Sequence, residues 1–189
     1  MIYEVKNAII KTLDVKLNTS LFWFGTVTFE EAKTHLDLKL SINKPNIYIL
    51  GDIGTSFDDE ITYIHEQLGN SPILHINCKI AEDFDKIGRV ENNGESGTII
   101  FHNLSQSLRI FFEPALYILD RQHAFSPIQT KFKNWTLIFT DCFEKPKENN
   151  LEDKDILHHY NRKLFMAGIR PEMQGRIGLW AYKKDVVLR

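Results

Sequence analysis

The sequence predicts an α/β domain in which a five-stranded parallel sheet is covered by helices on both faces. Short, continuous apolar runs are typical of strands that are buried on both faces. Such runs occur at residues 47–50, 73–78, 98–101, 135–140 and 177–182. Segments with helical patterns lie between them, and this alternation favours parallel strands joined by crossover helices.

Length and composition indicate one ordinary globular domain. The 189 residues can bury a substantial core, and 43% of them are hydrophobic and 25% charged. The net charge of −2 gives no general attraction to nucleic acids or acidic membranes. There is no long apolar run and no signal-peptide pattern, so we expect a cytoplasmic protein that does not enter a membrane.

The N-terminal part divides into an extension and the start of the domain. We expect residues 1–27 to be an extension packed on the core, and residues 28–189 to be the α/β domain. The aromatic cluster at 21–25 is expected to pack against the helix that follows it. Thr28 and Glu31 have the spacing of a capping box, and apolar residues then recur at helical spacing, which predicts a helix that ends near Ile42.

The most informative segment follows the first strand, where a glycine-containing turn leads into a helix. It has the frame of a phosphate-binding loop, Gly-x-x-x-x-Gly-Lys-Ser/Thr, but not its chemistry. The second glycine of that motif falls on Ser56, the lysine on Phe57 and the hydroxyl on Asp58. We expect Asp58 and Asp59 to cap the helix in place of a bound anion. The degenerate nucleotide loop comprises Gly51, Asp52, Gly54, Thr55, Ser56, Phe57 and Asp58.

Further helices are predicted at about 59–68, 105–120 and 152–166. The first of these ends at Gly69-Asn70, and a polar connector with a turn at Asn92-Asn93-Gly94 follows the second strand.

Four segments, in order, resemble the AAA+ domain of the sigma-54-dependent transcription activators. Residues 51–55 are similar to the family's Walker A Gly-Glu-Ser-Gly-Thr, and 71–78 to its Pro-Phe-x-x-Ile-Asn-Cys strand. Residues 95–104 resemble its Walker B strand, and 169–177 its Phe-Arg-x-Asp-Leu-x-x-Arg-Leu motif. The resemblance implies a three-layer P-loop NTPase or AAA+-like core with strand order 5-1-4-3-2 and no helical lid.

The resemblance also implies that the catalytic groups are missing. The family's Walker B aspartate and glutamate, which hold magnesium and activate water, correspond to His102 and Asn103. The residue that senses the γ-phosphate falls near Asp141 or Cys142. The family's Gly-Ala-Phe-Thr-Gly-Ala loop and its C-terminal helix-turn-helix have no counterpart, so we expect no direct DNA binding.

Two arginines of the last matching motif are retained. In the family, arginines of this motif act on the nucleotide of a neighbouring subunit. Arg170 and Arg176 are therefore candidate trans-acting arginines. The alternative is that both hydrate a surface turn or pair with Glu172 or Asp185.

These patterns predict a non-catalytic regulatory or assembly module, a pseudo-ATPase without cofactor. It would act through a protein partner or by self-association, with active AAA+ relatives as candidate partners. One alternative is a sigma-54-type transcription regulator that binds ATP and magnesium with little or no hydrolysis. A second alternative is an enzyme or metal site built from Cys78, His102 and Cys142 at the ends of three adjacent strands.

Overall fold

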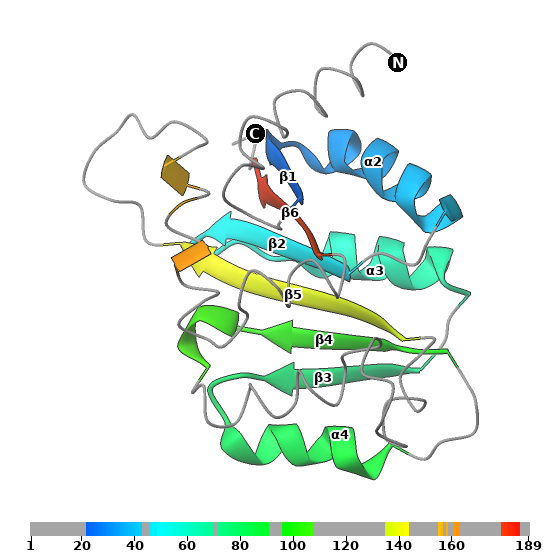
Figure 1. The fold of residues 1–189 in the computed structure, drawn as a ribbon, viewed down its shortest axis with the longest axis vertical. Coiled ribbons are helices and arrows are strands. Elements are labelled where there is room, and N and C mark those ends of the chain that lie inside the picture. Colours follow the sequence, from blue (N-terminus) through cyan, green and yellow to red (C-terminus); the bar gives the residue numbers. More distant parts are fainter. Residues whose placement is uncertain are drawn as a thin grey trace.

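The strands form one six-stranded sheet in which all neighbouring pairs are parallel (Figure 1). The structure is a computed structural model that describes residues 22–42, 46–69, 72–90, 96–107, 135–143, 155–156, 158, 161–162 and 179–185. The order of the strands in the sheet is β1-β6-β2-β5-β4-β3. Their bounds are β1 Phe22–Val27, β2 Asn46–Asp52, β3 Ile73–Asn77, β4 Thr98–His102, β5 Thr136–Phe143 and β6 Leu179–Lys184.

The prediction of five strands is wrong, because the aromatic cluster near residue 22 forms a sixth strand. β1 pairs with β6 at the edge of the sheet, in the register Phe22↔Trp180 and Thr26↔Lys183, with an irregularity between these pairs. The complete order therefore differs from the predicted 5-1-4-3-2, although the five predicted strands keep their mutual order within it. Aromatic residues favour strands as well as packed cores, so the composition of this cluster did not distinguish the two. Residues 22–27 belong to the sheet, whereas the rest of the expected extension lies outside the described residues.

The helix α2, Phe29–Ile42, begins and ends as predicted. The Thr28 N–H donates to Glu31 Oε2 over 2.8 Å, and the Glu31 N–H donates to Thr28 Oγ1 over 3.3 Å. This reciprocal pair is the capping box expected from the sequence.

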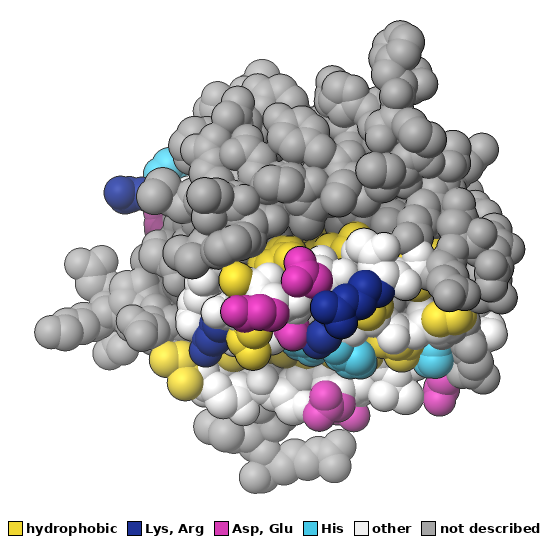
Figure 2. Space-filling view, turned by 90° about the horizontal axis from the view of Figure 1, so that it is seen from below, with side chains coloured by type: hydrophobic (Ala, Val, Ile, Leu, Met, Phe, Trp, Pro, Cys, Tyr) yellow, Lys and Arg dark blue, Asp and Glu magenta, His cyan; other side chains and the backbone are white. Residues whose placement is uncertain are grey.

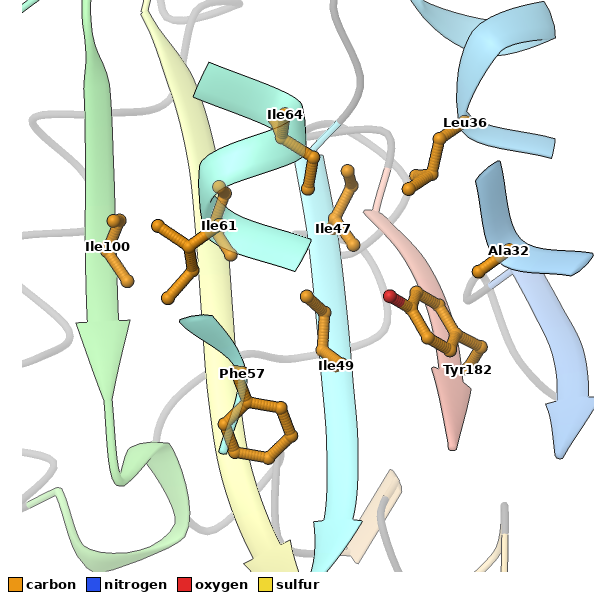
Figure 3. Close-up of a cluster of buried hydrophobic side chains, with 10 residues drawn as sticks. Ala32, Leu36, Ile47, Ile49, Phe57, Ile61, Ile64, Ile100 and Tyr182 are labelled. Carbon is orange, nitrogen blue, oxygen red and sulfur yellow. The ribbon is translucent and has the colours of Figure 1, made fainter. Parts of the chain in front are cut away.

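The helices α2 and α3, Asp58–Gln67, cover one face of the sheet (Figure 3). Alternate residues of the strands point to this face, and the helices contribute apolar side chains to the same layer. The buried members of this cluster are Ala32, Leu36, Ile47, Ile49, Phe57, Ile61, Ile64, Ile100, Ile138 and Tyr182. α3 ends just before Gly69, as predicted, and the φ of +78° at Gly69 suits glycine.

The opposite face is also buried, as Tyr48, Phe101 and Phe139 show. The helices predicted at 105–120 and 152–166 lie mostly outside the described residues. What is described of the first is a 3-10 turn, η2, at Leu104–Gln106, and of the second a few helical residues between 155 and 162. In the described part of the chain, no helix is long and apolar enough to cross a membrane.

The connector after β3 contains two short helices that the sequence did not reveal, η1 at Ala81–Phe84 and α4 at Asp85–Arg89. They protect the free edge of β3. Asp83 accepts the Asn77 N–H over 2.8 Å, Lys86 donates to the His75 carbonyl over 3.3 Å, and the two side chains form an ion pair of 2.8 Å. Figure 2, seen from this side, shows basic, acidic and histidine side chains together on the described surface. Charges of this kind oppose the pairing of another strand at an edge.

The core packing predicts a large effect of truncation at Ile64, which is fully buried between α3 and the sheet. Ile64→Ala should lower the free energy of unfolding by about 2–5 kcal/mol, because it removes buried methyl groups and leaves a cavity. Glu66→Ala, on the exposed side of α3, should change it by less than about 0.5 kcal/mol. Urea denaturation followed by circular dichroism measures both, and equal effects would contradict this packing.

Candidate functional site

The candidate site lies at the edge of the sheet where the parallel strands have their carboxyl ends, the usual ligand position in open α/β folds. All six strands run in the same direction and end there. The degenerate loop, His102, Asn103 and both cysteines lie at or directly after these strand ends. Cys142, His102 and Cys78 belong to the ends of the three adjacent strands β5, β4 and β3, as predicted.

The loop after β2 is a tight turn. The Thr55 N–H donates to the Asp52 carbonyl over 3.0 Å, and Gly54 has a φ of +88°. This is the backbone of a type II turn, which favours glycine at that position. At Gly51, a Cβ would lie 2.7 Å from the Cβ of Thr55. Both glycines are therefore explained by the folding of the loop itself.

Phe57, at the position of the phosphate-binding lysine, points into the core. Its side chain is 9% exposed and belongs to the cluster between α3 and the sheet (Figure 3). The side chain that would have to reach a phosphate is thus used for hydrophobic packing.

The predicted capping of α3 by Asp58 and Asp59 is wrong. The N-cap residue is Phe57, whose side chain makes no capping hydrogen bond. The reason is local: the Ser56 hydroxyl donates to Asp58 Oδ2 over 2.7 Å and accepts the Asp58 N–H over 3.2 Å, which turns the Asp58 carboxylate toward Ser56. The acidic residue that is buried in this first turn is Glu60.

Two lysines at the end of β6 hold this loop, and the sequence reasoning missed them. Lys184 Nζ lies 3.0 Å from both carboxylate oxygens of Glu60 and donates to the Ser56 carbonyl over 3.0 Å. Lys183 Nζ lies 3.3 Å from Asp52 Oδ1. Neighbouring residues of a strand point to opposite faces, so the loop is contacted from both sides of the sheet. The signal in the sequence was the lysine pair directly after the last apolar run.

Glu60 is fully buried, and burial is the largest influence on its pKa. Burial raises the pKa of Glu60, while the hydrogen bond from Lys184 opposes that shift. Tyr182, also fully buried, has a pKa raised well above its usual value by burial and by the nearby Glu60. Its hydroxyl has no hydrogen-bond partner among the described residues.

His102, at the position of the Walker B aspartate, has both ring nitrogens engaged. Nε2 is 2.9 Å from Nδ1 of His75, and Nδ1 is 3.3 Å from Thr140 Oγ1. The two imidazole planes differ by 2° while the ring centres are 5.2 Å apart. Rings stacked face to face would have their centres nearly as close as their nitrogens, so these rings lie edge to edge and share one N–H···N hydrogen bond.

Asn103, at the position of the Walker B glutamate, is a turn residue. It has a left-handed backbone with φ 57°, and its amide donates to Asn77 Oδ1 over 3.2 Å. Asparagine tolerates this conformation better than most residues. Neither His102 nor Asn103 supplies a carboxylate to hold magnesium or to activate water.

Asp141, near the predicted sensor position, is buried. Its carboxylate accepts hydrogen bonds from the Ser105 N–H at 2.8 Å, the Ser105 hydroxyl at 2.9 Å and the Tyr48 hydroxyl at 3.3 Å. It therefore fastens η2 to the sheet and does not face an open site.

The alternative of a site built from Cys78, His102 and Cys142 is not supported. Among the described residues, no group of three or more His, Cys, Asp and Glu side chains is placed to hold a metal ion. Burial raises the pKa of the Cys78 thiol to about 12, and burial also raises the pKa of Cys142. Both thiols are thus protonated at neutral pH, which disfavours a nucleophile or a ligand. Arg170 and Arg176 lie outside the described residues.

Comparison with known proteins supports the fold. No protein-family model matches this sequence, and no curated protein matches it. Among solved structures, the chain is similar to the AAA+ ATPase Hsp104 in a cryo-EM reconstruction of its closed state with ATPγS and FITC-casein. The TM-score is 0.53 and the sequence identity 14%, over 81% of this chain and 31% of the Hsp104 chain. The chain therefore has an AAA+-like fold, and its likeness to sigma-54 activators stays a prediction from sequence.

The surroundings of His102 predict a pH dependence of stability. Burial first, and then neighbouring His75, lowers the pKa of His102 below its usual value of 6.5, against a smaller opposite effect of Asp58. The unfolded chain then binds more protons than the folded one, so the free energy of unfolding should fall as pH drops from about 7.5 to about 5.5.

The variant His102→Gln should weaken this dependence, as measured by urea denaturation at both pH values. Glu60, with its raised pKa, acts in the opposite direction, but it is present in both proteins and cancels in the comparison. An identical pH dependence in the two proteins would contradict the assignment.

Proposed function

We propose that this chain is a non-catalytic AAA+-like module, a pseudo-ATPase that acts through protein contacts. The observation that carries the proposal is Phe57: the position that needs a lysine holds an aromatic ring that is part of the hydrophobic core. A core side chain cannot turn toward a phosphate without opening the packing between α3 and β2.

The Walker B positions support the same conclusion. His102 and Asn103 are tied to His75, Thr140 and Asn77. In phosphoryl transfer the carboxylates at these two positions hold magnesium and orient the attacking water. His102 and Asn103 have no carboxylate for either role.

Protein contacts are supported by the exposed hydrophobic residues. Among the described residues, the large hydrophobic side chains with high exposure are Ile53, at 67%, and Ile80, at 44%. Both follow the carboxyl end of a strand, β2 and β3 respectively, and so lie toward the same edge of the sheet. β5 and β4 lie between these two strands, so the two isoleucines are separate apolar points along one edge that a partner could cover.

The proposed partner is a second copy of this chain or an active AAA+ relative of the sigma-54 activator type. In the second case Arg170 and Arg176 would act on the nucleotide of that relative, as the sequence resemblance implies.

The proposal predicts that titration of the purified protein with magnesium-ATP in a calorimeter gives no saturable binding at millimolar ligand, and that no ATP is hydrolysed. Phe57→Lys should restore neither property, because His102 and Asn103 remain unsuited to magnesium and water activation. It should instead lower the melting temperature, since it removes a buried aromatic ring worth about 2 kcal/mol or more. Saturable binding would favour the ATP-binding regulator, and measurable turnover by the unmodified protein would refute the proposal.

Exposure of Ile53 and Ile80 predicts the effect of making both polar. Ile53→Ser combined with Ile80→Ser should reduce self-association or partner binding, while the free energy of unfolding changes by less than about 0.5 kcal/mol per site. Light scattering at increasing protein concentration measures the first and urea denaturation the second. The matched control is Glu66→Ser, on the exposed side of α3. Association that is equal in all three proteins would show that this edge is not the contact.

A further inference from the structure

The N-terminus of α3 is where a phosphate would bind in a nucleotide-binding version of this fold. Free backbone N–H groups and the helix dipole favour an anion there. In this chain the anion present in the first turn of α3 is the carboxylate of Glu60, a fully buried residue.

The cation of the site is also present, but it comes from a different strand. Lys184 contacts both Glu60 oxygens at 3.0 Å and the Ser56 carbonyl at 3.0 Å. β6 is the direct neighbour of β2, in the register Leu50↔Lys183. The end of β6 is therefore next to the loop that follows β2, and Lys184 brings to this loop a cation that position 57 does not supply.

A second, independent feature points to an anion at this place. Tyr182 is fully buried, lies two residues before Lys184 on the same face of β6, and has a hydroxyl without a hydrogen-bond partner among the described residues. Figure 3 shows this hydroxyl directed from β6 toward α3. A buried donor without an acceptor is rare and costs stability, which is expected where a site was shaped for a ligand oxygen.

We propose that Glu60 acts as an internal ligand in a self-occupied oxyanion site formed by the N-terminus of α3 and Lys184, with the Tyr182 hydroxyl as a further donor that the carboxylate leaves unused. The carboxylate takes the position of a polyphosphate and holds the loop closed without nucleotide. The Glu60 carboxylate thus prevents the site from binding external anions such as pyrophosphate. This inference rests on the proposed function, because it explains how the loop stays ordered once nucleotide binding has been lost.

The test is to empty the site. Glu60→Ala removes the internal ligand and leaves Lys184 without its counter-ion, so the variant should bind inorganic pyrophosphate about tenfold or more tighter than the unmodified protein. Isothermal calorimetry at constant ionic strength measures this. Asp59→Ala is the matched control, because it removes the same charge from an adjacent, exposed position of the same helix turn and should leave binding unchanged.

Two second-site variants identify the groups that bind. Glu60→Ala with Lys184→Met should lose the gained affinity, and Glu60→Ala with Tyr182→Phe should keep only part of it. If Glu60 and Lys184 form only a structural ion pair, none of these variants should change the affinity for pyrophosphate.

A loss of folding in Glu60→Ala would not end the test, because an anion that fills the site should restore the fold. The melting temperature of the variant should then rise with pyrophosphate by more than that of the Asp59→Ala protein. No gain of binding in a folded variant, or no rescue of an unfolded one, would overturn the internal-ligand proposal and leave the proposed function intact. Saturable magnesium-ATP binding by the unmodified protein would instead refute the proposed function.

Discussion

A fully buried carboxylate in the first turn of α3 requires a cation and hydrogen-bond donors, and this chain takes the cation from the end of β6. Desolvation of Glu60 is costly, and the pairing with Lys184 offsets that cost only because strand order places β6 beside β2. The loop, the helix and the last strand are therefore interdependent. Removing either charge would leave the other buried without a partner, which is the situation that proteins tolerate least.

Elsewhere at the strand-end edge, several polar side chains also form hydrogen bonds with one another. Asp141 fastens η2 to β5 through Ser105, Asn77 receives the Asn103 amide, and His75 and His102 share a hydrogen bond. Hydrogen-bond networks of this kind stabilise one arrangement of the edge. In an active nucleotide-binding domain several of these positions would be open toward ligand and metal.

Similarity to Hsp104 at 14% identity concerns the arrangement of strands and helices. Function depends on the groups at the strand ends, and the same fold accommodates different groups there. Phe57 illustrates the difference: a hydrophobic side chain at that position strengthens the packing of α3 on the sheet, while it removes the group on which phosphate binding depends.

The sequence by itself determined the positions of five strands, the helix that begins after Thr28 and the end of α3 before Gly69. It also showed that positions 57, 102 and 103 hold Phe, His and Asn and not the lysine and carboxylates of the Walker motifs. All of these depend on patterns within a few neighbouring residues. It could not reveal β1 as a strand, the short helices η1 and α4, or which acidic residue of α3 is buried. Only the tertiary structure decided that Glu60 meets Lys184 across 124 residues of sequence and that His75 meets His102. Such pairs form because strand order and register bring distant residues together, and local patterns carry no record of register.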